Sequence, residues 1–171
     1  TSNSITEFEE KVTIPGISML LNNIPYNFSF TSYVNENIKW ISGIQGMLTK
    51  NSNDESAESS LIPNASSYDI GSYSLLQYSK SQFETQIGLR YDTREIDAGD
   101  LLSKNFSKLN GSFGIVFQKG LYTLRTNFSS GFRPPHLSEM LSYGVHHGTN
   151  RFEIGSQDLE LSLIHISEPT R

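Results

Sequence analysis

The feature that most restricts the fold of this chain is a set of long runs in which apolar and polar residues alternate. In the clearest run, one set of alternate positions holds Thr85, Ile87, Leu89 and Tyr91, and the other holds Gln86, Gly88, Arg90 and Asp92. Similar runs begin at Pro25, Phe106 and Leu121. Successive side chains of a strand point to opposite faces, so this period of two predicts strands with one apolar and one polar face. The sequence therefore predicts an all-β protein.

The connections between these runs alternate between short and long. Tight turns are expected at 34–37, 80–82 and 118–120, and long polar loops at 51–66 and 95–105. We expect the loops at 51–66 and 95–105 and the segment 133–155 at one end of the strands, with the turns at 80–82 and 118–120 at the other. This asymmetry is typical of transmembrane barrels, whose two rims carry turns and loops of different length. Residues 1–22 are weakly patterned and predict a loop and one strand.

A transmembrane barrel and a soluble β-sandwich both alternate, and two observations favour the barrel. The expected strands are roughly 10 to 12 residues long, against about 5 to 6 in soluble sheets. The polar face carries Arg90, Lys108 and Arg125, which a dry sandwich core does not bury unpaired. Mean hydropathy, at -0.37, separates neither class, and no apolar run reaches the ~18 residues of a spanning helix. A soluble β-sandwich binding or adhesion module remains the alternative.

Composition excludes several functions. The net charge of -5 argues against nucleic acid as a partner. The sequence has no cysteine and lacks a Gly-x-Ser-x-Gly elbow, an HExxH motif and a phosphate loop. We therefore predict that the protein is not an enzyme and needs no cofactor, with an outer-membrane barrel hydrolase as a further alternative.

The most informative stretch runs from residue 129 to residue 159. It contains Gly131, Phe132, Arg133, Pro135, Glu139 and Met140, followed by Gly144, His146, His147, Gly148, Phe152, Glu153, Ile154, Gly155 and Leu159. This order resembles a segment of the barrel domain of TonB-dependent outer-membrane receptors, and the resemblance extends over about residues 25–160. The family usually has a Glu soon after the last Leu, where this chain has Ser162.

The resemblance implies that residues 1–160 are part of a large transmembrane β-barrel and form an open, curved antiparallel sheet. It implies a receptor in the outer membrane of a Gram-negative bacterium, which binds a scarce ligand (siderophore, haem, cobalamin, metal or glycan) and imports it with TonB-derived energy. The implied partners are outer-membrane lipid, the small-molecule ligand and the TonB system, which would act through a plug domain that this sequence does not include.

Candidate ligand-binding residues come from the same stretch. Pro134 and Pro135 have no amide hydrogen, so the preceding strand must leave the ladder there. Leu137, Met140 and Leu141 have helical spacing, which predicts one helical turn that starts near His136 and is capped by Gly144. The resemblance implies that this segment folds inward from the extracellular rim. Arg133 and Glu139 are expected to pair or to contact the plug, or to form a solvated ion pair.

The ligand-binding residues proposed on this basis are Arg133, His136, Glu139, His146 and His147. His146 and His147 also suggest a metal site, with His136, Glu139 and Glu153 as further ligands. Adjacent side chains on an extended chain point apart, however, so imidazoles that hydrogen-bond within the loop are the favoured interpretation.

The last eleven residues, 161–171, resemble a translated sequencing adaptor. We predict that they are a non-native tail that adds nothing specific to the fold, against the alternative of a genuine strand with Leu161, Leu163 and His165 in alternation.

Overall fold

The computed structural model describes residues 1–8, 15–146, 151–159 and 162–170. Its main feature is one antiparallel sheet, in which the strands follow each other in chain order up to β7 and the last neighbour is β10. The strands are β1 (Ser2–Phe8), β2 (Pro15–Asn35), β3 (Ile38–Asn53), β4 (Ala65–Lys80), β5 (Phe83–Asp97), β6 (Ser103–Lys119), β7 (Tyr122–Arg133) and β10 (Ser162–Thr170). Between β7 and β10 lie a short helix, α1 (Leu137–Leu141), and a separate hairpin of β8 (Tyr143–His146) and β9 (Arg151–Ile154).

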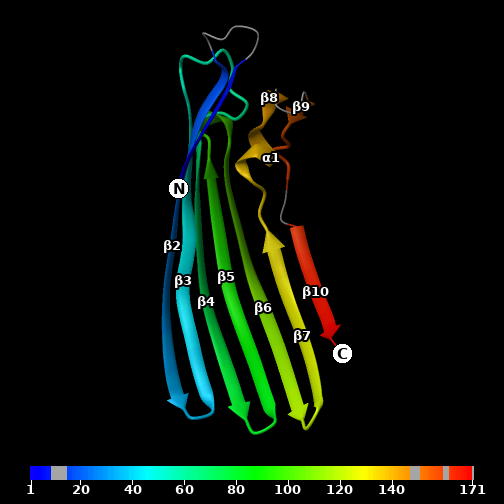
Figure 1. Cartoon of the computed structure of the whole chain (residues 1–171). Coiled ribbons are helices and arrows are strands. Elements are labelled where there is room, and N and C mark those ends of the chain that lie inside the picture. The colour runs from blue at the N-terminus through cyan, green and yellow to red at the C-terminus, as the bar shows by residue number, and fades with distance from the viewer. Residues whose placement is uncertain (9–14, 147–150, 160–161, 171) are drawn as a thin grey trace.

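The sheet is open, because β1 and β10 lie at opposite edges of it and do not pair with each other. The long, curved strands lie side by side, which confirms the predicted all-β fold and open curved sheet (Figure 1). No helix in the described part of the chain is long and apolar enough to cross a membrane.

The two ends of the sheet differ as the loop lengths predicted. Short turns join β2 to β3, β4 to β5 and β6 to β7 at one end, and the longer connections, α1 and the β8–β9 hairpin lie at the other (Figure 1). The tight turns use left-handed backbone conformations at Ser81 (φ 52°) and Gly120 (φ 59°), which let the chain reverse within two residues. We call the end that carries α1 the loop end.

The alternation of the sequence is reproduced in the two faces of the sheet. Cross-strand register places Leu89 opposite Gly111, Ile87 opposite Phe113 and Thr85 opposite Ile115. This outer face carries large exposed apolar side chains on every strand from β2 to β7, among them Phe28, Ile44, Ile70, Leu76, Leu89, Leu109, Phe113, Leu124 and Phe128. No second sheet covers that face within the described residues, so the two-layer β-sandwich alternative does not describe this fold.

Four details of the sequence prediction were wrong. Strands β2 to β6 have 15 to 21 residues, longer than expected, because their alternation continues through stretches read as loop. Residues 1–22 contribute two strands, β1 and the start of β2, which pair with each other. The stretch 51–66 is not fully exposed, since Asn51, Leu61 and Ala65 are buried.

The fourth error concerns the end of α1. The helix is capped by Ser142, whose N–H donates to the Ser138 carbonyl oxygen at 3.1 Å, and not by Gly144, which belongs to β8. Gly144 lies against Leu61 instead, where an added Cβ would meet Leu61 at an ordinary contact distance of 3.6 Å.

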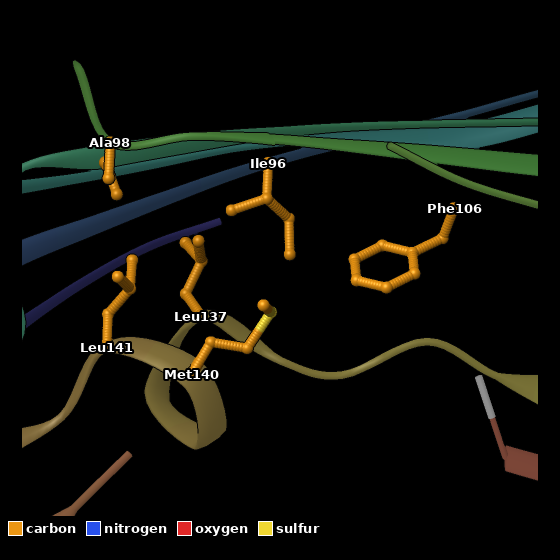
Figure 2. Packing of buried hydrophobic residues seen from close by; sticks show 7 residues of the cluster. Ile96, Ala98, Phe106, Leu137, Met140 and Leu141 are labelled. Atoms are coloured by element: carbon orange, nitrogen blue, oxygen red, sulfur yellow. The ribbon is translucent and has the colours of Figure 1, made fainter. Parts of the chain in front are cut away.

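The buried apolar core lies at the loop end, between the inner face of the sheet and α1. The helix contributes Leu137, Met140 and Leu141, and the wall contributes Ala65, Ile96, Ala98 and Phe106. Figure 2 shows the helix side chains pointing toward Ile96 and Phe106 on the sheet. Met140 and Ile96 are 1% and 0% exposed, so α1 is a packed part of the fold.

The tail forms strand β10, which pairs with β7 from Ser162 opposite Arg133 to Thr170 opposite Arg125. The alternative of a strand therefore describes the conformation of residues 162–170. An edge strand presents unpaired N–H and C=O groups to any extended neighbour, so this pairing needs no specific side chains. The origin of the tail stays a prediction.

Candidate functional site

The chain leaves the sheet wall after β7 and crosses its inner face. Pairing between β6 and β7 ends at Ser112 opposite Ser129, although β7 continues to Arg133. Pro134 and Pro135 follow, and neither has an amide hydrogen to donate to a ladder. The described residues 133–146 and 151–155 then lie at the loop end, and α1 packs over the inner face against β5 and β6 (Figures 1 and 2). The predicted inward fold of this segment is therefore present, and we call it the crossing segment.

Three of the predicted site residues lie together at the start of the crossing segment. Arg133 Nη2 is 2.5 Å from Glu139 Oε1, and the His136 backbone N–H donates to Glu139 Oε2 at 2.9 Å. Glu139 thus closes the first turn of α1 by accepting from the residue that precedes the helix. This hydrogen bond from His136 lowers the pKa of Glu139, and the positive charge of Arg133 adds to that effect against the raising effect of burial.

The pair remains partly open to solvent, with side-chain exposures of 57% for Arg133 and 39% for Glu139. His136 is also exposed. Arg133 and Glu139 therefore form a solvated ion pair, which was one of the expected arrangements, and with His136 they present one cation, one anion and one imidazole at the loop end.

The β8–β9 hairpin carries the second part of the predicted site. His146 lies at the end of β8, opposite Arg151 in β9, and His147 lies outside the described residues. Tyr143, Val145, Phe152 and Ile154 occupy alternate positions of the hairpin and are exposed. Tyr143 and Phe152 pack edge to face with ring centroids 5.5 Å apart. The hairpin thus exposes an apolar, aromatic face at the loop end.

The described residues give the metal hypothesis no further support. They contain no group of three or more His, Asp or Glu side chains placed to hold an ion. Glu139, which was one of the suggested ligands, has both oxygens engaged by Arg133 and the His136 amide.

Sequence reasoning missed an ion pair on the wall beneath the crossing segment. Arg94 Nε lies 2.5 Å from Asp69 Oδ1, and Arg94 Nη2 donates to Asp69 Oδ2 at 2.6 Å. The remaining Nη1 donates to the Pro135 carbonyl oxygen at 3.2 Å. The alternation of Arg90, Asp92 and Arg94 on one face was a visible signal of charge pairing, but the partners on β4 and in the crossing segment lie far away in the sequence.

A second ion pair lies one step farther from the loop end. Arg90 Nη2 is 2.5 Å from Asp92 Oδ1, and the pair lies across Gly71, where any Cβ would collide with both side chains. The Gln45 amide oxygen, in the orientation its neighbours favour, accepts from Arg90 Nη1 at 2.9 Å. The Arg90 guanidinium also lies 5.9 Å from the centre of the Tyr73 ring. Arg90 and Arg94 of the inner wall are therefore each held in a neutral pair with an aspartate.

Two of the hollows along this wall border Arg94. The wall hollow, of about 660 Å³, is lined among others by Gln45, Gly71, Arg90, Asp92 and Arg94. The rim hollow, of about 280 Å³, lies nearer the loop end and is lined among others by Thr49, Ile96, Arg94, Pro135 and His136. Arg94 lines both hollows, so it lies at the boundary between them, where it also contacts Pro135.

Comparison with known proteins identifies the fold. The family described as "TonB dependent receptor-like, beta-barrel" matches residues 16–162. No curated protein matches the chain closely enough to count as a relative. Solved structures of the FrpB iron transporter from Neisseria meningitidis are similar: the F3-3 variant has a TM-score of 0.62 at 20% identity over 71% of this chain, and the F5-1 variant in its apoprotein form has a TM-score of 0.62 at 21% identity over 72%.

These similarities cover 21% and 23% of the two FrpB chains, so this chain spans under a quarter of their length. At such low identity they establish the fold alone. The family match is broader, because it includes most of the chain and ends at residue 162, which leaves nearly all of the tail outside it. This chain therefore belongs to the TonB-dependent receptor β-barrel family, a family of outer-membrane transport receptors of Gram-negative bacteria and not of enzymes.

Proposed function

We propose that this chain is part of the barrel of an outer-membrane receptor that binds an iron-containing ligand at the loop end and imports it with TonB-derived energy. In this proposal residues 1–160 belong to the barrel domain, including the crossing segment, and residues 161–171 are a non-native tail. The outer apolar face contacts lipid, and a plug domain outside this sequence connects the receptor to TonB.

The observation that carries the proposal is the crossing segment. A structural wall needs no segment that leaves the ladder and lies over its polar face, because such a segment gives up strand pairing with β6 after Ser129. Its core against Ile96 and Phe106 holds it rigidly. A rigid segment at one rim, with exposed polar and aromatic groups, is suited to hold a ligand in a defined position.

The exposed groups suggest how a ligand would be recognised. Arg133 supplies a charged donor for carboxylate or other anionic oxygens, and His136 supplies an imidazole; Glu139 holds the Arg133 guanidinium and the His136 backbone N–H. The hairpin that carries His146 adds the rings of Tyr143 and Phe152, which suit the flat apolar parts of a chelate or macrocycle. We propose Arg133, His136, Glu139, His146 and His147 as ligand-facing residues.

Iron is proposed because the structural neighbours are described as iron transporters. The iron could be carried by a siderophore, by haem or by another chelate, and the uptake test distinguishes these carriers. The proposal therefore commits to an iron-containing ligand and leaves its carrier as an outcome of the test.

The test is uptake of radioactive iron by cells that depend on the complete receptor carrying this segment. Iron would be supplied in parallel as haem, as ferric citrate and as a ferric hydroxamate or catecholate, in strains with and without TonB. Uptake of one form that requires both TonB and the receptor would support the proposal. If no iron form is taken up in a TonB-dependent way, while cobalamin or a glycan is, the choice of iron is wrong.

The role of the crossing segment is tested by Arg133→Gln, with Arg125→Gln as the matched control near the other end of the same strand. Both variants remove one inner-face charge from β7. We expect ligand affinity to fall in Arg133→Gln and to stay unchanged in Arg125→Gln. Equal loss in both variants would show that the wall's overall charge, and not the crossing segment, determines binding.

A further inference from the structure

The side chain of Arg94 hydrogen-bonds both the wall of the sheet and the crossing segment. Two of its donors are held by the Asp69 carboxylate at 2.5 and 2.6 Å, and the third reaches the Pro135 carbonyl oxygen at 3.2 Å. Asp69 lies on β4, Arg94 on β5 and Pro135 beyond β7. One guanidinium thus connects three parts of the chain that are far apart in the sequence.

The environment makes these bonds strong and directional. The side chains of Arg94 and Asp69 are only 14% and 18% exposed, so water competes little for their donors and acceptors. The bidentate contact fixes the plane of the guanidinium, which leaves Nη1 aimed in one direction. Pro135 is itself buried, and its carbonyl lies in that direction.

The contacted carbonyl lies at a sensitive point. His136 follows Pro135 directly, its N–H bonds Glu139, and Glu139 pairs with Arg133. A shift of the Pro135 carbonyl therefore moves the start of α1 and the proposed ligand-facing residues together. The apolar core of Met140 and Leu141 packs the helix against the wall, and the hydrogen bond from Arg94 adds a directional contact at the residue before His136.

We propose that Arg94, oriented by Asp69, is a positioning residue that sets where the crossing segment lies on the wall and so places Arg133, His136 and Glu139. This inference rests on the proposed function only for its consequence in ligand binding. The structural part stands on the contacts of Arg94 alone.

The test compares Arg94→Lys with Arg90→Lys in the complete receptor. Both arginines lie on the same face of β5, four residues apart, and each pairs with an aspartate. The contacts described for Arg90 reach Asp92, Gln45 and Tyr73, all on the wall. Lysine keeps the charge but cannot hold a carboxylate with two donors while giving a third to a carbonyl. Only the Arg94 variant should release the crossing segment.

The first measurement is the distance between two spin labels. This chain contains no cysteine, so labelled cysteines can be introduced at exposed Ser138 on α1 and exposed Ser79 at the far end of β4, with any cysteine elsewhere in the receptor replaced. We expect one narrow distance distribution in the parent and in Arg90→Lys, and a broadened or shifted one in Arg94→Lys. Amide exchange in residues 137–141 should accelerate roughly tenfold in Arg94→Lys, the size expected for loss of one charge-assisted hydrogen bond.

Asp69→Asn provides a second variant in case Arg94→Lys does not reach the outer membrane. It keeps an acceptor of the same shape but removes the charge that orients Arg94, so we expect a smaller broadening in the same direction. Unchanged distances and exchange in both variants would overturn the inference. Equal changes in Arg90→Lys would also overturn it, because the effect would then belong to any charge on the wall.

Ligand binding separates this inference from the proposed function. Affinity for the transported iron form should fall roughly tenfold in Arg94→Lys and stay unchanged in Arg90→Lys. Altered spin-label distances in a receptor that takes up no iron form would support the positioning role and contradict the proposed function. Normal iron uptake with unaltered spin-label distances in Arg94→Lys would support the proposed function and contradict the positioning role.

Discussion

Gly155 lies so close to the backbone of Met140 that a Cβ at position 155 would be 2.6 Å from the Met140 carbonyl carbon and 2.7 Å from the Leu141 nitrogen. The contact is completed by two hydrogen bonds, from Gly155 N–H to the Ser142 carbonyl at 2.6 Å and from Ser156 N–H to the Glu139 carbonyl at 2.9 Å. The end of β9 is therefore fastened to α1, and the crossing segment forms one closed unit with its own hairpin.

This closeness predicts the effect of Gly155→Ala. The methyl group would meet backbone atoms, which cannot rotate away as a side chain can, so β9 must separate from α1. We expect faster amide exchange in residues 137–146 and 151–155, with β4 and β5 unaffected. Gly111→Ala is the matched control, since a Cβ there meets Leu89 and Gly88 only at 3.8 and 3.9 Å. Equal effects of the two substitutions would contradict the close contact.

The two faces of β5 should respond differently to charge. Leu89 is 58% exposed on the outer face, so Leu89→Arg in lipid should lower the free energy of unfolding by about 2 to 4 kcal/mol if the residue lies near the bilayer midplane. Gln86→Arg, three residues away on the polar face, should change it little. The measurement is reversible unfolding of the complete receptor in lipid vesicles. Equal destabilisation at both positions would show that both faces are buried in protein.

The stability of the crossing segment should depend on pH because of the Glu139 carboxyl group. Its pKa is lowered in the folded state, first by the His136 amide and then by Arg133, whereas an unfolded Glu titrates near ~4.3. A lowered folded pKa means that the carboxylate stabilises the segment above the unfolded pKa, and that this contribution is lost as pH falls through the folded pKa. Exchange in α1 should therefore accelerate below about pH 4.

Glu139→Gln is the control for this pH effect, because it keeps the size of the side chain and removes its titration. The variant should exchange faster than the parent at neutral pH and show a much weaker acid response in residues 137–141. An acid response of the same size in both proteins would assign it to other carboxyl groups.

We expect the pairing of the tail strand β10 with β7 to depend on extended backbone shape and not on the tail's side chains. Replacing residues 161–171 by a scrambled version with the same alternation should leave amide protection of β7 unchanged, because edge pairing uses backbone groups. Deleting these residues should raise exchange in residues 125–133, which pair with β10, and leave β3 to β5 unaffected. Loss of protection in the scrambled tail would show that specific side chains hold β10.

The open sheet predicts the behaviour of the isolated chain. The sheet within residues 25–160 has six strands, β2 to β7, where family barrels close with roughly 22, and in lipid each unpaired edge group costs several kcal/mol. Residues 25–160 refolded alone in detergent should therefore aggregate or remain heterogeneous. A monodisperse monomer with one cooperative unfolding transition would show that these strands close on themselves.

Several parts of this structure could be predicted from the sequence because their causes are local. Alternation assigned Leu89 to the apolar outer face and Gln86 to the polar inner face, since each side chain's face follows from its parity within a strand. Loop lengths separated the two ends of the sheet, because successive connections of an antiparallel sheet lie at alternate ends. Pro134 and Pro135 marked the point where the chain leaves the sheet, because a proline has no N–H to donate to the ladder.

The tertiary structure alone decided how distant parts of the chain meet. The pairing of Arg94 with Asp69 depends on the register of β4 with β5, and its bond to Pro135 depends on how far the crossing segment returns over the wall. The burial of Leu61, in a stretch that reads as an exposed loop, follows from the same return, because Gly144 lies against it and the Tyr143 N–H donates to its carbonyl oxygen at 3.0 Å. Local sequence fixes which way a side chain points, but the partner it meets is set by segments tens of residues away whose positions are determined only when the whole sheet and its core form together.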